Sequence, residues 1–336
     1  MAWQERLNGD SLTWLLEPDA DNPSIRYFAL RDLLNRPDSD SDVVAAQRAI
    51  MTSGPVPVIL DAQQPEGYWQ QPGGGYHKYR GTVWQIMLLS EFGADPADER
   101  VQRGCEYVFS HTIASSGGFA ASNTTPIPSR IIHCLNGNLL YALISLGLLD
   151  DPRVQGALDW QVQRITGEES IQQSGTGAPI FACPANEKQS CGWGGTKAMK
   201  ALAAVPPAQR TPAIQRAIER GAQFLLGYDL AKADFPYTGK ISSAWFKLGF
   251  PLSYWSDVLE TLAALVALGY GGDARLSLAY QWLLDKQDAQ GRWKLENALN
   301  SKMWIDIEKK GKPSKWITLR MLRVIKAVEQ ARDKAN

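Results

Sequence analysis

Apolar residues recur at helical spacing in six stretches of this chain. One such stripe is formed by Leu139, Leu140, Leu143 and Leu146. A spacing of three and four residues places these side chains on one face of a helix. The sequence therefore predicts six mostly apolar helices, at Pro23–Leu34, Gly81–Phe92, Leu135–Leu146, Gly195–Val205, Asp257–Leu268 and Trp316–Val328.

More amphipathic stretches lie between the apolar ones, at Asp98–His111, Asp151–Ile165, Thr211–Leu230 and Asp273–Gln287. Three of them begin at an aspartate, which can cap the first helical turn and favours the positive end of the helix dipole. The centres of successive apolar helices are about 53 to 62 residues apart. That distance suits a helix pair with a substantial loop. Strand signals are weak and predict small edge hairpins at most.

A seven-residue motif, Q-x-x-x-G-x-W, occurs at Gln63–Trp69 and again at Gln287–Trp293. A single helical hairpin cannot bury its own apolar face, whereas stacked copies can. We interpret Trp69 and Trp293 as packing residues that pin an outer helix to the next loop. The repeat predicts an all-α fold, an (α/α)6 toroid. It would form one domain over residues 1–336, with the repeats at about 23–328.

Composition narrows the classes of function. The 336 residues are 44% hydrophobic and carry no net charge. The absence of a basic stripe argues against a nucleic acid partner. The longest uncharged apolar run is too short to span a bilayer, so no transmembrane segment is expected. The first residues lack the basic segment and apolar core of a signal peptide, and we expect a cytoplasmic protein.

The starts of the predicted inner helices carry unusual residues. Inner helices of an α/α barrel run parallel, so their N-termini surround one end of a cavity and direct partial positive charge at a ligand there. We expect a small-molecule substrate in this cavity, with Asp257 and His133 as catalytic residues. Asp257 is also a good helix cap. The substrate-binding candidates are Tyr79, Arg80, Trp84, Asn138, Trp193, Lys197, Tyr254, Trp255, Lys315, Trp316 and Arg320.

The four cysteines suggest thiols rather than a disulfide framework. Cys134, Cys183 and Cys191 lie at or before predicted inner-helix starts and could bind Zn²⁺, which prefers sulfur and nitrogen ligands. Buried inert thiols, or a redox or nucleophilic cysteine, are the alternatives. The glycine-rich loop at 73–75 has no strand–helix phosphate signature after it, so no nucleotide cofactor is expected.

The repeats resemble the terpenoid cyclase and protein prenyltransferase superfamily, from about Pro23 to Val328. Within it the chain is similar to stand-alone bacterial squalene-cyclase-like proteins. That likeness lies in Cys134-Leu135-x-Gly137-Asn138, in Phe250-Pro251-Leu252 before Asp257, and in Gly311-Lys312-Pro313-Ser314-x-Trp316. The acidic D-x-D-D motif of squalene-type cyclases is absent. The resemblance to protein prenyltransferases implies zinc held by Asp, Cys and His, for which Asp257, Cys134 and His133 are counterparts in kind.

Three functions remain open from the sequence. The first is an enzyme with an aromatic-lined cavity that acts on an isoprenoid-like substrate, stabilising a carbocation by cation–π attraction. In it Asp257 is the acid or base, and Arg80, Lys197, Lys315 and Arg320 hold a diphosphate. The second is a hydrolase of esters or glycans that uses a zinc-bound water. The third is a binding or scaffold protein without catalysis. The oligomeric state is not predicted.

Overall fold

The computed structural model describes residues 2–167 and 179–334. This part of the chain is predominantly helical, as the sequence predicts, with one small antiparallel pair of β1 (Trp293–Lys294) and β2 (Pro313–Ser314). The α-helices are α1 (Ser11–Leu16), α2 (Pro23–Phe28), α3 (Ser41–Thr52), α4 (Pro55–Asp61), α5 (Thr82–Glu91), α6 (Glu99–Thr112), α7 (His133–Ser145), α8 (Pro152–Thr166), α10 (Gly192–Ala204), α11 (Pro212–Leu226), α12 (Val258–Leu265), α13 (Ser277–Leu284) and α14 (Lys315–Asp333).

The six apolar stretches all coincide with helices. They correspond to α2, α5, α7, α10, α12 and α14, and α2 and α12 continue into π-helical turns at Ala29–Leu33 and Val266–Tyr270. The four amphipathic stretches become α6, α8, α11 and α13. Apolar residues at helical spacing indicate a helix with one buried face, and this pattern predicted the positions of these helices well.

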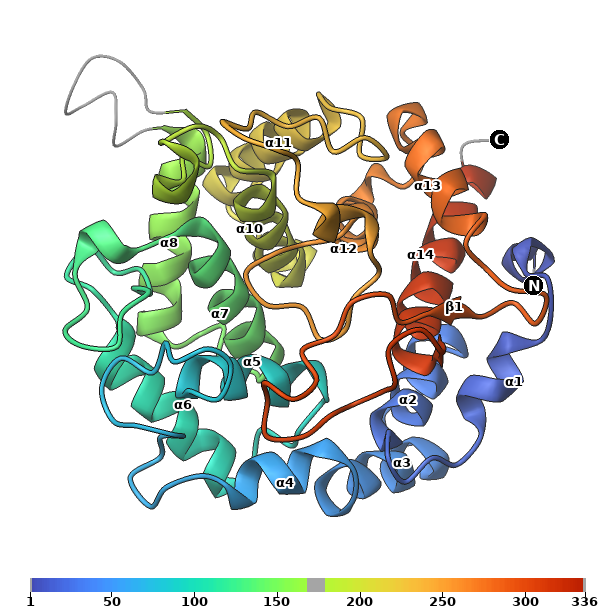
Figure 1. The fold of residues 1–336 in the computed structure, drawn as a ribbon, viewed down its shortest axis with the longest axis horizontal. Helices are drawn as coiled ribbons and strands as arrows, with labels where there is room; N and C mark the ends of the chain where they lie inside the picture. The colour runs from blue at the N-terminus through green and yellow to red at the C-terminus, as the bar shows by residue number, and fades with distance from the viewer. Residues whose placement is uncertain (1, 168–178, 335–336) are drawn as a thin grey trace.

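The apolar helices contact one another in a closed sequence. Contacts join α5 to α7, α7 to α10, α10 to α12, α12 to α14, and α14 to α2. Ser24 at the start of α2 donates a hydrogen bond of 2.7 Å to the carbonyl of Phe92, which follows α5, and this completes the ring. Figure 1 shows these helices around a central region, with α3, α4, α6, α8, α11 and α13 at the periphery.

One close approach within the ring depends on a glycine. A Cβ atom at Gly137 of α7 would lie 2.6 Å from the backbone carbonyl of Lys197 on α10. A side chain there would push the two helices apart. Lys197 is itself buried at this contact.

Three outer segments begin with the same aspartate–arginine pair. Asp98, Asp151 and Asp273 each accept a hydrogen bond from the backbone N–H two residues ahead. The arginine at that position also forms an ion pair with its aspartate, at 2.6 to 2.8 Å. The expectation that these aspartates cap the first turn is confirmed.

The Q-x-x-x-G-x-W motif is a structural unit. Gly67 and Gly291 have φ of +99° and +73°, a left-handed backbone that favours glycine. Two residues later, Trp69 and Trp293 are fully buried. The predicted packing role of both tryptophans is confirmed.

One stretch, Ser41–Asp61, is apolar and long enough on composition alone to cross a membrane. It spans α3 and α4, which are separate helices. The break is at Ser53 and Gly54, and Gly54 has φ of +68°. A single stretch of this kind is weak evidence for a membrane span, and 39% of its apolar window is buried inside the protein.

Candidate functional site

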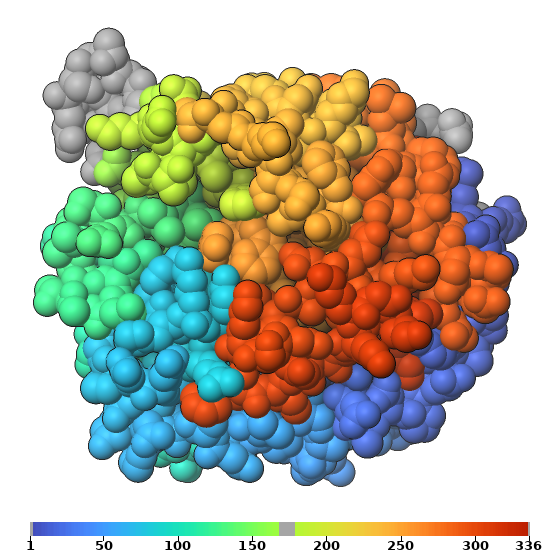
Figure 2. Space-filling view, viewed as in Figure 1, coloured from blue at the N-terminus to red at the C-terminus, as the bar shows by residue number. Residues whose placement is uncertain are grey.

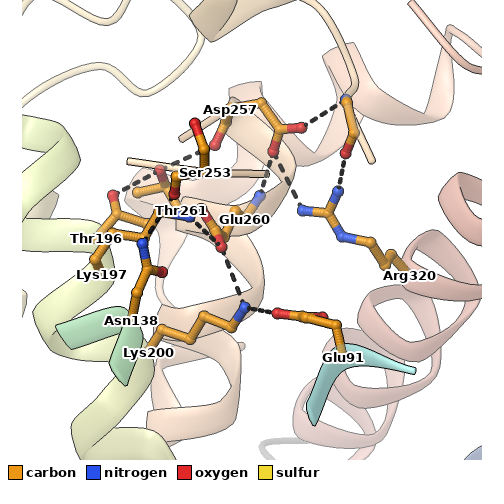
Figure 3. A network of polar contacts seen from close by, with 11 residues as sticks. Glu91, Asn138, Thr196, Lys197, Lys200, Ser253, Asp257, Glu260, Thr261 and Arg320 are labelled. Atoms are coloured by element: carbon orange, nitrogen blue, oxygen red, sulfur yellow. Dashed lines mark hydrogen bonds and ion pairs between the residues drawn. The ribbon is translucent and has the colours of Figure 1, made fainter. Parts of the chain in front are cut away.

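Two buried residues of opposite charge meet inside the helix ring. The Nζ atom of Lys197 on α10 lies 2.8 Å from Oε1 and 2.7 Å from Oε2 of Glu260 on α12 (Figure 3). Lys197 is 1% exposed and Glu260 4% exposed. Burial alone would raise the pKa of Glu260, but the nearby cations, Lys197 first among them, outweigh burial and lower this pKa to about 2. Glu260 is therefore ionised at neutral pH.

Lys200, three residues after Lys197 on α10, extends the network. Its Nζ atom lies 3.3 Å from Oε1 of Glu260 and forms an ion pair with Glu91 at the end of α5. The same atom lies 4.0 Å from the ring centre of Tyr141 on α7. Burial lowers the pKa of Lys200, but Glu91 and Glu260 raise it above its ordinary value. Lys200 therefore stays protonated.

Asp257, the expected catalytic residue, is the cap of α12. Its Oδ1 accepts the Glu260 N–H at 2.7 Å, and its Oδ2 accepts the Gly249 N–H at 3.0 Å. Arg320 of α14 lies 3.3 Å from Oδ1 and donates to the Gly249 carbonyl at 2.8 Å. Asp257 is fully buried. These contacts join the segment before α12 to α12 and α14. Asp257 therefore has the structural role of a helix cap, which the sequence left open as the alternative to catalysis.

The cavity that this network lines, called the main cavity below, lies toward the C-terminal ends of α5, α7, α10 and α12. Its volume is about 320 Å³. The network residues Glu91, Tyr141, Lys200, Glu260 and Arg320 line one part of it. The rest of the lining is mostly apolar: Ala203, Ala204, Phe250, Leu252, Ala263, Ala264, Val266, Ala267, Val324 and Ala327, together with Arg323.

The N-terminal ends of the inner helices enclose an aromatic cluster instead of a large cavity. The ring of Tyr79 lies 5.3 Å from that of Trp84 and 6.0 Å from that of Trp255, and Trp193 lies 6.3 Å from Tyr254. The space that remains beside Tyr79 and Trp84 is about 20 Å³, room for about one water molecule. The expectation of a large cavity lined by these aromatic residues is wrong, because the rings pack on one another and fill the space.

Two of the polar binding candidates, Asn138 and Lys197, line this small space. Asn138 donates to the carbonyl of Ser253 at 2.9 Å. Ser253 belongs to the segment that precedes α12. In Figure 2 the centre of this face is covered by that segment and by the red-orange segment between β1 and β2. Both polar residues are thus engaged within the protein.

The remaining binding candidates join segments of the fold. Arg80 donates to the carbonyl of Met303 at 3.1 Å. Lys315 pairs with Asp19 at 3.1 Å. The ring of Trp316 stacks on Phe250, with ring centres 4.0 Å apart, and its indole N–H donates to Asn22 at 3.0 Å. Among the eleven binding candidates, Arg320 alone lines the main cavity.

His133, the second expected catalytic residue, packs toward the outer helix α8. Its Nδ1 lies 2.7 Å from Nε2 of Gln161, and its ring lies 5.4 Å from both Trp160 and Phe181. Burial, with a contribution from Arg164, lowers the pKa of His133 to about 4. The imidazole is therefore neutral at pH 7. The structure does not bring it together with Asp257.

The three candidate metal ligands form a pair and a separate thiol. Cys183 and Cys191 form the pair, and the interaction with Cys191 lowers the pKa of Cys183 to about 6 despite burial. Burial raises the pKa of Cys134 to about 12. Within residues 2–167 and 179–334, no three His, Cys, Asp or Glu side chains lie close enough to hold a metal. The arrangement expected for Zn²⁺ is therefore not supported.

Sequence reasoning did not single out Glu91, Tyr141, Lys200 or Glu260. A signal was present, since Lys200 and Glu260 stand inside stretches predicted as buried apolar helices. A charged residue in such a place requires a buried partner. Searching the predicted inner helices for charges would have found this pair of residues.

The chain was compared with known proteins. No protein-family model matches it, and no curated protein matches it. Among solved structures it is similar to the type II terpene cyclase MstE from Scytonema in its apo form, with 16% identity, a TM-score of 0.40, and coverage of 93% of this chain and 88% of that chain. A variant of that enzyme in complex with merosterolic acid A gives 16% identity and a TM-score of 0.31, with coverage of 82% and 95%. Neither likeness assigns a family or an activity to this chain.

Proposed function

We propose that this chain is an enzyme that acts on a hydrophobic, isoprenoid-like substrate in the main cavity. We also propose that its ring of helix pairs is an (α/α)6 toroid that forms one domain. The observation that carries the proposal is an apolar cavity with one charged wall. Its volume of about 320 Å³ lies at the lower end of the range of small-molecule sites.

The apolar part of the cavity suits a hydrocarbon chain. Six alanines contribute to it, from α10, from α12 and its continuation, and from α14. Their short side chains leave room between the helices, where longer ones would close it. Each buried CH₂ group of a ligand is worth ~0.8 kcal/mol, so a branched hydrocarbon chain would supply most of the binding energy.

The charged wall limits the chemistry. Glu260 is ionised at neutral pH, because its pKa is lowered to about 2. It can accept a proton or stabilise positive charge on a substrate, but it cannot start a reaction by donating a proton. Lys200 and Arg320 are cationic and suit a polar or anionic head group. The proposal therefore places the substrate's head group at this wall and its hydrocarbon chain along the alanines.

Ligand binding tests the proposal first. Farnesol, farnesyl diphosphate and squalene would be titrated against the protein, with tryptophan fluorescence as the signal. The cavity variant is Ala263→Phe, which introduces a ring into the apolar wall. The control is Leu278→Phe, because Leu278 on α13 is 67% exposed and lies outside the cavity lining. We expect the cavity variant to weaken binding by at least tenfold and the control to leave it unchanged.

Product analysis by gas chromatography and mass spectrometry then separates catalysis from binding. Conversion of a bound isoprenoid, lost in Ala263→Phe, supports an enzyme. Binding without conversion of any substrate would favour the non-catalytic protein. Ala267→Phe, at an exposed position of the cavity lining, serves as a second variant if Ala263→Phe does not fold. Equal binding by the cavity variants and the control would contradict the proposed site.

A further inference from the structure

Cys183 and Cys191 are held together by a short antiparallel contact just before α10. Ala182 pairs with Ser190, the Cys183 N–H donates to the Gln189 carbonyl at 3.1 Å, and the Cys191 N–H donates to Phe181 at 3.0 Å. Because side chains alternate along paired strands, Cys183 and Cys191 project from the same face at diagonal positions. The two side chains are near enough for each thiol to shift the pKa of the other.

The chain between the two cysteines is a tight turn. Glu187 and Lys188 both have positive φ, at 48° and 62°, and the Lys188 N–H returns to the Cys183 carbonyl at 2.9 Å. Asn186 within the turn also donates to the Pro236 carbonyl at 2.9 Å, which anchors the turn to the segment before α12. Both cysteines are half-buried, and most residues between them are exposed. A small reagent can therefore reach the pair.

The third cysteine is not part of this contact. Cys134 lies at the start of α7, and burial, with a contribution from Cys183, raises its pKa. In the described part of the chain, however, no three potential ligands lie within metal-binding reach of one another. Two thiols on the same face of this antiparallel contact, with the third apart, fit a disulfide better than a zinc site with three or four ligands.

We propose that Cys183 and Cys191 are a reversible dithiol–disulfide pair that is oxidised by a peroxide. The sulfur of Cys183 attacks one peroxide oxygen, the O–O bond breaks, and a sulfenic acid and water form. The sulfur of Cys191 then attacks that of Cys183. The S–S bond forms as the S–O bond breaks, and the released hydroxide leaves as water with the thiol proton.

Overall, two thiols and one hydrogen peroxide give one disulfide and two waters. Two equivalents of a small thiol such as glutathione reverse the oxidation. The Cys183 sulfur is the better nucleophile, because Cys191 and the backbone N–H groups of Ala185 and Asn186 lower its pKa. The proposal is independent of the substrate in the main cavity.

The test is peptide mapping of the full chain after mild treatment with hydrogen peroxide and alkylation of the remaining thiols. We expect one disulfide linking Cys183 to Cys191, which glutathione reduces. The variants Cys105→Ser and Cys134→Ser should form it as readily. In Cys191→Ser the resolving thiol is gone, so a dimedone-reactive sulfenic acid should accumulate at Cys183.

Three results would overturn the proposal. The first is that Cys183 and Cys191 stay free while the variants remain folded by circular dichroism. The second is that a disulfide forms with Cys134 instead. The third is near-stoichiometric zinc by elemental analysis, lost in both Cys134→Ser and Cys183→Ser, with all three thiols protected from alkylation. That result would restore the three-thiolate metal site.

Discussion

Trp69 and Trp293 make the same pair of hydrogen bonds at opposite ends of the chain. The indole N–H of Trp69 donates to the Ile59 carbonyl, and that of Trp293 donates to the Leu283 carbonyl, both at 2.7 Å. The backbone N–H of each tryptophan donates to a threonine hydroxyl near the start of the next inner helix, at 3.2 and 3.1 Å. The repeated motif thus joins an outer helix to the following inner helix.

The first prediction concerns this equivalence. Trp69→Phe and Trp293→Phe each remove a buried hydrogen bond and create a small cavity, while the accepting carbonyl keeps the N–H of Ala62 or Lys286 as its other donor. We expect each change to lower the free energy of unfolding by about 2–4 kcal/mol, by similar amounts. Urea unfolding followed by circular dichroism measures it. Trp282→Phe on the outer helix α13, where the indole is half-buried, is the control and should cost clearly less. A large difference between Trp69→Phe and Trp293→Phe would contradict their equivalence.

The helices could be predicted because their apolar stripes depend only on the sequence. In α7, Leu139 and Leu143 are spaced for one buried face and both are fully buried. The aspartates before the outer segments are similarly local signals. Closure of the ring depends on contacts between distant segments, such as that of Ser24 with Phe92, and no local pattern contains them.

The second prediction concerns the buried pair in the ring. Lys197→Met leaves the charge of Glu260 without its principal partner, so we expect a loss of about 3–5 kcal/mol in the free energy of unfolding. The double variant Lys197→Met with Glu260→Leu removes both charges and should be more stable than Lys197→Met alone. The surface control is Arg275→Ala, which breaks an exposed pair with Asp273 and should cost less than ~1 kcal/mol.

Chemical denaturation of the wild-type protein, Lys197→Met, Glu260→Leu, the double variant and Arg275→Ala decides the matter. If Lys197→Met costs no more than the surface control, the pair is not electrostatically coupled as its geometry implies. The double variant could also lose more free energy of unfolding than the sum of the losses in Lys197→Met and Glu260→Leu. In that case Lys200 depends on Glu260 as well, and the network acts as one unit.

The site was harder to predict than the helices for a physical reason. Sequence places Tyr79, Trp84 and Trp255 near inner-helix starts, but whether such rings surround a space or fill it depends on their packing. Here the rings meet and fill it. Small residues toward the ends of α10 and α12 decide where the cavity opens. An alanine in a sequence does not by itself indicate a cavity, because alanine also occurs in closely packed helices. Lys200 and Glu260 were the available clue.

A third prediction concerns the segment that covers the aromatic cluster. Arg80 donates to the Met303 carbonyl, the Trp304 indole donates to the Arg80 carbonyl, both at 3.1 Å, and the guanidinium lies 5.3 Å from the Trp304 ring centre. Arg80→Ala removes the first and third contacts. We expect a lysine-specific protease to cleave at the exposed Lys302 several-fold faster in this variant. Arg48→Ala, far along the chain on α3, is the control, and an unchanged cleavage rate in Arg80→Ala would show that other contacts hold the segment.

The last prediction is a pH dependence of stability caused by His133. Burial lowers the pKa of the folded-state imidazole from 6.5 to about 4, so the folded protein binds this proton more weakly than the unfolded chain does. The stabilisation is complete above pH 6.5 and is lost as the pH falls toward 4, by about 3 kcal/mol in total. His133→Gln should remove this part of the slope between pH 7 and pH 4, whatever its effect at pH 7. His77→Gln, in the glycine-rich loop, should retain it. Free energies of unfolding at closely spaced pH values measure both slopes, and a variant of His133 with the full slope would show that other groups cause the acid sensitivity.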